Sequence, residues 1–179
     1  TSGTIAGVPG RIFRISFSGE SSFELNVPAS YGRHVWEKVF EYGAPYGITP
    51  YGTEGMHLLR AEKGFILVGQ ETDGTVTPHD LGMGWAVSTK KDFLGKRSLS
   101  TSALAAANRK QLVGLKPHDA KFKLEEGAHV VETQNLPKPP VPMLGHVTSS
   151  YFSPELGHTF ALALIKNGEN RKGETLYVP

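Results

Sequence analysis

The sequence contains no cysteine, no long apolar run and no marked excess of charge of either sign. Without cysteine the chain cannot form a disulfide, a thiolate metal site or a cysteine nucleophile, and this composition fits the reducing cytoplasm that we predict as its location. No apolar run reaches the roughly 18 residues that a membrane-spanning helix requires. The net charge is only +2 and the charged residues are scattered, so neither nucleic acid nor a membrane is predicted as a partner.

The 179 residues, of which 39% are hydrophobic, are enough for one sizeable domain or two small ones. Because the pattern changes near residue 109, we expect an α+β domain over residues 1–108 and a small β domain over residues 109–179. The chain opens with Thr1, Ser2 and Gly3, which is unlike a translation start. We therefore expect it to be a piece of a longer protein, whose first domain lacks its N-terminal portion.

Apolar periodicity predicts both strands and helices in the first domain. Alternating and β-branched residues predict strands, beginning with a hairpin, and apolar residues at helical spacing predict amphipathic helices. The second helix is expected to have Thr53 as its N-cap. The expected strands are 11–18, 23–27, 65–68 and 85–87, and the expected helices are 31–42, 53–63 and 96–108.

After residue 109 the chain shows short strand-like runs separated by turns, and no helical pattern. Such a series is typical of a small β-barrel. Four prolines lie between Leu136 and Pro142, and a segment so stiff and so poor in hydrogen-bond donors is expected on the surface rather than within the sheet. The expected strands are 111–115, 128–132, 145–149, 160–165 and 175–178.

Glu24 is the first candidate for binding chemistry. It follows a glycine-bearing turn and lies on a strand whose opposite face carries Phe23 and Leu25. A carboxylate fixed on a strand can accept two parallel hydrogen bonds from a planar ligand edge, such as the amide N–H and amino group of a pterin. The plainer alternative is a solvated glutamate of a hairpin.

Other polar groups indicate structure more than chemistry. Arg60 and Glu62 are two residues apart on a predicted helix, so they do not face each other and are expected to brace the helix end. His79 and Asp80 lie near a helical turn without a positioned nucleophile, which favours a turn or cap role. The seven histidines form no HxH or HxxxH pair, so no metal site is predicted.

Four motifs occur in order over nearly the whole chain. Residues 14–24 resemble an arginine-containing strand followed by G-Y-T-G-E-x-G-x-E, and residues 59–64 match L-R-x-E-x-G. Residues 75–85 resemble T-x-P-x-x-x-G-L-x-W, and residues 145–165 contain G-x-V-T-S, S-P-x-L-G and A-L-A-x-I. Together these motifs resemble the aminomethyltransferase family, the glycine-cleavage T-protein group, with its relatives in dimethylglycine dehydrogenases and sarcosine oxidases.

Segments 51–57 and 69–78 are most similar to the alpha subunits of heterotetrameric sarcosine oxidases. The resemblance implies an antiparallel sheet with packed helices, the ferredoxin-like part of the T-protein fold, followed by a C-terminal β-barrel. It also implies that the region binds tetrahydrofolate, with Glu24 at the position of the family's pterin-contacting glutamate. Phe17 and Trp85 are candidate aromatic walls of the same site.

Two departures from the family pattern limit what this region is expected to do. The family's second helix begins with a folate-contacting arginine, and Met56 stands at the matching position. The family's catalytic aspartate lies upstream of the matched region. We therefore expect no catalytic residue in this chain and no activity from it in isolation.

The resemblance implies a parent enzyme that oxidises sarcosine at a flavin in another subunit. This region would then help to transfer the one-carbon unit to tetrahydrofolate, forming 5,10-methylenetetrahydrofolate. FAD, FMN and NAD would belong to the parent complex rather than to this region, and the other oxidase subunits would be its partners. Two alternatives stay open: a non-catalytic module for subunit assembly, and a free aminomethyltransferase of glycine cleavage.

Overall fold

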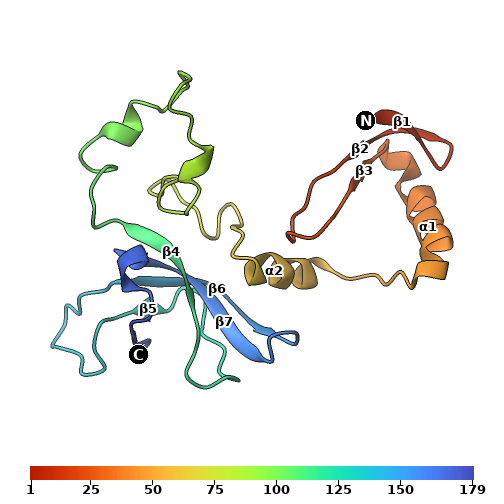
Figure 1. Ribbon diagram of the computed structural model, residues 1–179. Coiled ribbons are helices and arrows are strands. Elements are labelled where there is room, and N and C mark those ends of the chain that lie inside the picture. The colour runs from red at the N-terminus through yellow and green to blue at the C-terminus, as the bar shows by residue number, and fades with distance from the viewer. The chain divides into compact units, whose positions relative to one another are not determined.

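Antiparallel pairing of short strands organises both parts of the chain. The computed structural model describes residues 1–179, which separate into an N-terminal unit, Thr1–Phe65, and a C-terminal unit, Ile66–Pro179. The N-terminal unit combines a small sheet with helices, and the C-terminal unit is built on a second sheet (Figure 1). The predicted α+β class is confirmed.

The N-terminal unit contains a three-stranded antiparallel sheet in the order β1-β2-β3. Ala6 and Gly7 both have positive φ and form the two-residue turn between β1 and β2, a turn whose twist matches that of paired strands. The predicted hairpin is present as β2 and β3, but both strands are shorter than expected. The strands are β1 (Ser2–Ile5), β2 (Val8–Phe13) and β3 (Glu24–Asn26).

Both predicted helices of this unit are present, as α1 (Gly32–Gly43) and α2 (Thr53–Glu62). The N-cap prediction was wrong, because Gly52 occupies the N-cap of α2 and no side chain caps the helix. Glu54 lies in the first turn of α2, where a negative charge interacts favourably with the helix dipole. Neither helix is both long enough and apolar enough to cross a bilayer.

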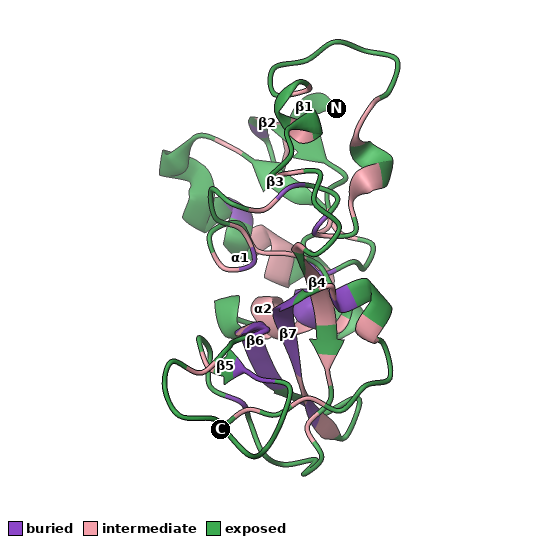
Figure 2. Cartoon of the chain, turned by 90° about the vertical axis from the view of Figure 1, so that its left-hand side faces the viewer, coloured by how far each residue is buried: buried purple, intermediate pink, exposed green.

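The N-terminal unit buries few apolar side chains. Its buried hydrophobic residues are Val8, Val35 and Ala61. Most of β1, β2 and β3 is exposed (Figure 2). The unit therefore leaves large apolar side chains uncovered, both on the strands and next to them. Examples are Ile12, Phe13, Phe23, Leu25 and Tyr31.

The C-terminal unit contains a curled four-stranded antiparallel sheet in the order β4-β7-β6-β5. Its core lies on one face of β6 and β7, whose residues are mostly buried (Figure 2). The last predicted strand is reduced to a single bridge between Val131 and Tyr177. The strands are β4 (Lys110–Leu115), β5 (His129–Val130), β6 (Gly145–Ser153) and β7 (His158–Lys166). The core residues are Leu124, Val130, Leu144, Val147, Ala161, Ala163 and Ile165.

Residues 66–108 are irregular, and two predicted strands are absent from this part of the chain. Around residues 65–68 the backbone turns instead, because the Leu67 carbonyl accepts hydrogen bonds from the Gln70 and Glu71 amides. The Glu71 carboxylate in turn accepts the Leu67 amide at 2.8 Å. Residues 85–87 form part of a 3₁₀ turn, Gly84–Ala86, because no strand lies beside them to pair with.

The predicted helix over residues 96–108 was also wrong. Only a 3₁₀ turn, Ser98–Ser100, is present. The Ser100 hydroxyl donates to the Arg97 carbonyl and the Thr101 hydroxyl donates to the Ser98 carbonyl, both at 2.8 Å. Hydroxyl groups that bond to nearby carbonyls compete with helix formation, which explains why the helix does not extend.

A buried ion pair ties this irregular segment to the sheet. The Arg109 Nε lies 2.9 and 3.0 Å from the two carboxylate oxygens of Asp80, whose side chain is only 4% exposed. Arg109 also donates to the Thr75 and Ala103 carbonyls. Asp80 accepts the Thr77 amide at 2.7 Å, which is the turn role predicted for it, and its own carbonyl accepts the Leu112 amide of β4.

Gly145 is expected to tolerate no side chain. A Cβ built there would lie 1.8 Å from the Leu164 carbonyl oxygen on the neighbouring strand. We predict that Gly145→Ala lowers the free energy of unfolding by about 3 kcal/mol, because backbone atoms cannot move aside cheaply. Gly114→Ala is the matched control, since nothing lies within 4 Å of its Cβ position. Equal urea midpoints by circular dichroism for the two variants would contradict this reading.

The Asp80 carboxylate should make stability depend on pH. Burial raises the pKa of Asp80, but hydrogen bonds from Arg109 and Thr77 outweigh it and hold the pKa below its ordinary value of 3.8. A lowered pKa in the folded state stabilises the protein above pH 3.8, and this contribution is lost as the pH falls through the folded value.

We therefore predict that Asp80→Asn lowers stability at neutral pH by on the order of 3 kcal/mol, because it breaks a buried ion pair. The difference from the unmodified chain should shrink on acidification below pH 3.8. Urea titrations of both proteins across this range would measure it. Two curves that run parallel at all pH values would show that the ion pair does not set the acid stability.

Candidate functional site

Glu24 lies at the start of β3, directly opposite Phe13 of β2. Its side chain is exposed, and no hydrogen bond or ion pair within the chain engages its carboxylate. Antiparallel pairing on β2 holds its backbone in place, so the carboxylate oxygens are presented from a fixed strand. Both oxygens remain able to accept hydrogen bonds from a ligand.

The loop that precedes Glu24 is held against α2. Glu20 forms an ion pair with Lys63 just beyond the helix, with 2.8 Å between Oε1 and Nζ. Gly19 has a φ of +83°, and a Cβ there would lie 2.8 Å from the Lys63 side chain. The glycine of this motif is therefore needed both for its backbone conformation and for the close approach of the helix end.

Phe17 lies in the same loop, and its ring is close to that of His57 on α2. The two ring centroids are 6.2 Å apart and the planes are inclined by 34°. Phe17 is 38% exposed, so one side of the ring stays open to solvent. His57 could not be predicted from the sequence, because no periodicity connects residue 17 with residue 57. Phe17 and His57 thus form an aromatic pair in the same unit as Glu24.

Two residues of the family motifs lie in α2, Met56 in its first turn and Arg60 in its last turn. Met56, at the position of the family's arginine, is partly buried and supplies no charge. Arg60 is fully buried and donates from Nη1 to the Phe65 carbonyl at 3.0 Å. This bond extends from the last turn of the helix to the residues that follow it, which confirms that Arg60 braces the helix end.

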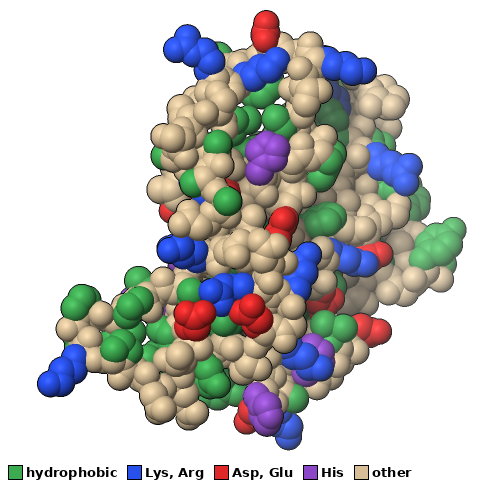
Figure 3. Space-filling view, turned by 60° about the vertical axis from the view of Figure 1, so that its left-hand side comes forward, with side chains coloured by type: hydrophobic (Ala, Val, Ile, Leu, Met, Phe, Trp, Pro, Cys, Tyr) green, Lys and Arg blue, Asp and Glu red, His purple; other side chains and the backbone are tan.

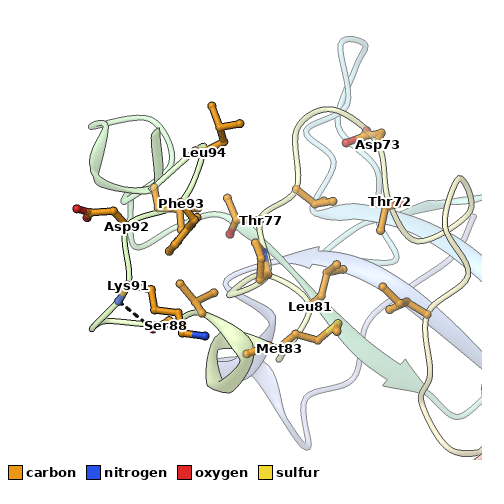
Figure 4. A pocket seen from close by; sticks show the side chains of 17 residues that line it. Thr72, Asp73, Thr77, Leu81, Met83, Ser88, Lys91, Asp92, Phe93 and Leu94 are labelled. Carbon is orange, nitrogen blue, oxygen red and sulfur yellow. Dashed lines mark hydrogen bonds between the residues drawn. The ribbon is translucent and has the colours of Figure 1, made fainter. Parts of the chain in front are cut away.

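Trp85, the third residue predicted for the site, belongs to the C-terminal unit. It lies in the 3₁₀ turn Gly84–Ala86 and its side chain is 83% exposed. The next residues, Ala86 and Val87, line a cavity of about 740 Å³. Apolar side chains such as Leu81 line most of this cavity (Figure 4).

Charged side chains show no concentration of one sign that would direct a highly charged ligand. Acidic and basic groups are interspersed on the face shown in Figure 3. A smaller cavity of about 170 Å³ is lined by His146, Lys110 and Asp73. Burial and the nearby Lys110 ammonium lower the pKa of His146, which keeps its imidazole neutral at physiological pH. No group of three or more His, Asp or Glu side chains is placed to hold a metal ion.

Two family descriptions match this chain. Residues 1–91 match the GCVT N-terminal domain, and residues 110–179 match the glycine cleavage T-protein C-terminal barrel domain. The second match agrees with the predicted β-barrel. The domain boundary expected at residues 108 and 109 stays a prediction, since it falls between the two matched ranges.

Similar proteins fall into two groups. Sarcosine oxidase subunit alpha of Corynebacterium sp. (strain U-96) is 56% identical, over 97% of this chain and 18% of that protein. The subunit alpha of Rhizobium meliloti (strain 1021) is 45% identical, over 94% of this chain and 17% of that protein. The aminomethyltransferase of Streptomyces avermitilis is 34% identical, over 91% of this chain and 43% of that protein. The chain thus spans less than a fifth of the first group and less than half of the second.

A solved structure shares the fold. The glycine cleavage system aminomethyltransferase T from Bartonella henselae superimposes with a TM-score of 0.76 at 24% identity, over 93% of this chain and 44% of that one. The likeness covers both units, and the family motifs lie where the two family descriptions match. From the sequence matches over residues 1–91 and 110–179, the chain belongs to the glycine-cleavage T-protein, or aminomethyltransferase, family.

Proposed function

We propose that this chain is the folate-binding region of a sarcosine oxidase alpha subunit. In this role it binds tetrahydrofolate and helps to transfer the one-carbon unit released from sarcosine, so that 5,10-methylenetetrahydrofolate forms. The higher identity to sarcosine oxidase subunits alpha, 56% against 34% for the aminomethyltransferase of Streptomyces avermitilis, supports this branch of the family over a free aminomethyltransferase.

The observation that carries the proposal is the state of the Glu24 carboxylate. It is exposed, it has no partner within the chain, and it lies on a paired strand. The family resemblance implies that Glu24 corresponds to the pterin-contacting glutamate. Two carboxylate oxygens match the adjacent N–H donors of a pterin edge. Glu24 therefore fits the pterin edge of a folate, and it would fix the orientation of the pterin.

Two aromatic residues have supporting roles in the proposal. The Phe17 ring, placed beside His57, offers an apolar surface in the same unit as Glu24. Trp85 is a second candidate wall, because its indole is almost entirely uncovered. Met56 cannot supply the charge of the family's folate-contacting arginine, so that contact is lost or supplied by other residues.

The wider assignment concerns the parent complex. We propose that FAD, FMN and NAD serve the oxidation of sarcosine elsewhere in that complex, that the other sarcosine oxidase subunits are this region's partners, and that the complex is a cytoplasmic heterotetramer. The chain supplies none of the catalytic groups. Its contribution is to bind and orient the folate that accepts the one-carbon unit.

A second candidate function is a module for subunit assembly that no longer binds folate. The uncovered apolar side chains of β2, β3 and α1, among them Phe13, Leu25 and Trp36, favour this alternative. Apolar surface of this extent normally indicates a protein interface. The two functions differ in one requirement, because only folate binding needs the Glu24 carboxylate.

We predict that Glu24→Gln weakens tetrahydrofolate binding by the complete alpha subunit by about 10- to 100-fold, because a charged acceptor is lost from two hydrogen bonds. Isothermal titration calorimetry would measure the Kd. Glu155→Gln is the matched control, since Glu155 is an exposed glutamate of the β6–β7 turn with no hydrogen bond or ion pair within the chain. Unchanged affinity in the Glu24 variant would favour the assembly function.

The isolated 179-residue chain is expected to be catalytically silent. It has neither the family's upstream aspartate nor a flavin-containing partner. Incubation with sarcosine and tetrahydrofolate, followed by mass spectrometry of the folates, should therefore show no 5,10-methylenetetrahydrofolate. The complete complex under the same conditions is the positive control, and turnover by the chain alone would refute the expectation.

A further inference from the structure

The loop at residues 88–97 borders the large cavity and presents apolar side chains outward. Leu94 is fully exposed at 103%, and Phe93 is 40% exposed. Phe93 points into the cavity toward Thr77, whereas Asp92 points away from it (Figure 4). Together with Ala86 and Val87, which also line it, these residues form an apolar surface around a cavity of about 740 Å³, which we call the 85–94 surface. A surface of this kind indicates an interaction site.

This loop is held in its conformation by hydrogen bonds. The Lys96 ammonium donates to the Lys91 carbonyl at 2.9 Å and forms an ion pair with Asp92 at 3.2 Å. The Ser88 hydroxyl accepts the Lys90 and Lys91 amides at 3.3 and 3.1 Å. The exposure of Phe93 and Leu94 is therefore a property of a pre-organised loop, which favours binding because little ordering cost remains.

The charges around the 85–94 surface are mainly basic. Lys90, Lys91 and Arg97 are exposed, and no carboxylate pairs with any of them, whereas Asp92 is engaged by Lys96. A segment that covers the apolar side chains would meet these three cations at its edge. Carboxylates at its own rim would complement them.

The relatives indicate where such a segment comes from. More than half of the aminomethyltransferase of Streptomyces avermitilis and more than four fifths of the sarcosine oxidase subunits alpha lie beyond the region that this chain matches. Both groups thus carry additional polypeptide beyond this region. A cover supplied by the same polypeptide would serve every member, whereas a cover from another oxidase subunit would serve only one group.

We propose that the 85–94 surface is a docking site for a segment of the same polypeptide outside these 179 residues, one that presents apolar side chains flanked by Asp or Glu. This proposal does not depend on folate binding. Residues 85–87, which have the sequence pattern of a strand but no strand to pair with, are the backbone that such a segment would meet. Docking would cover Phe93 and Leu94 together.

Limited trypsin digestion tests the proposal directly, because Lys90 and Lys91 lie within the loop. Cleavage at these lysines, mapped by mass spectrometry, should be at least about tenfold slower in the full-length polypeptide than in the 179-residue chain, whose folded state is first established by a cooperative urea transition, since cleavage follows the population of the uncovered state. Equal cleavage rates in the two proteins would overturn the proposal. Protection that appears only after the other oxidase subunits are added would also overturn it.

Two variants of the full-length polypeptide, each with a matched control variant, test which side chains hold the covering segment. Leu94→Ser should restore rapid cleavage at Lys90 and Lys91, whereas Leu156→Ser, a half-exposed leucine in the β6–β7 turn, should not. Arg97→Glu should also restore cleavage, and Arg97→Lys should leave it slow, if carboxylates line the covering segment. Slow cleavage in Leu94→Ser would refute apolar docking. If a variant fails to fold, the comparison of the unmodified proteins still decides the main proposal.

Discussion

The buried ion pair between Asp80 and Arg109 is the interaction on which the arrangement of the C-terminal unit depends. It joins a long irregular segment to the first strand of the sheet, and Arg109 adds hydrogen bonds to the Thr75 and Ala103 carbonyls. Residues 66–108 have no strand and only short 3₁₀ turns, so regular backbone pairing cannot hold them in place. One guanidinium therefore replaces the hydrogen-bond ladder that a strand would have provided.

Polar groups on the second face of the C-terminal sheet also hold the irregular segment in place. Thr148 and Ser149 of β6 are buried, which is unusual for polar residues in a strand. The Gln70 side chain donates to the Thr148 carbonyl, and the Ser149 hydroxyl donates to the Glu71 carboxylate. The sheet thus packs an apolar core on one face and fixes the irregular segment on the other. The large cavity and the 85–94 surface lie in the segment that these contacts anchor.

The N-terminal unit differs, because it has little buried core and relies on contacts between a loop and a helix. Its sheet buries little, yet the loop before Glu24 is tied to α2 through Lys63 and through the Phe17 and His57 rings. A fixed loop and an unpartnered carboxylate are what a ligand site requires, whereas the surrounding exposed apolar side chains are what an interface requires. The chain spans only 18% and 43% of two of its relatives, whose remaining length is additional polypeptide.

Local sequence pattern was sufficient to place α1, α2, β4, β6 and β7, and the motifs were sufficient to indicate the family. The expected helix over residues 96–108 is absent for a local reason too, because serine and threonine hydroxyl groups bond to nearby carbonyls. Other features depend on tertiary contacts: residues 85–87 have strand-like side chains but no neighbouring strand. Tertiary structure also brings together residues that are far apart in the sequence. Asp80 and Arg109 are 29 positions apart, and Phe17 and His57 are 40 positions apart. Sequence periodicity carries no information over such separations.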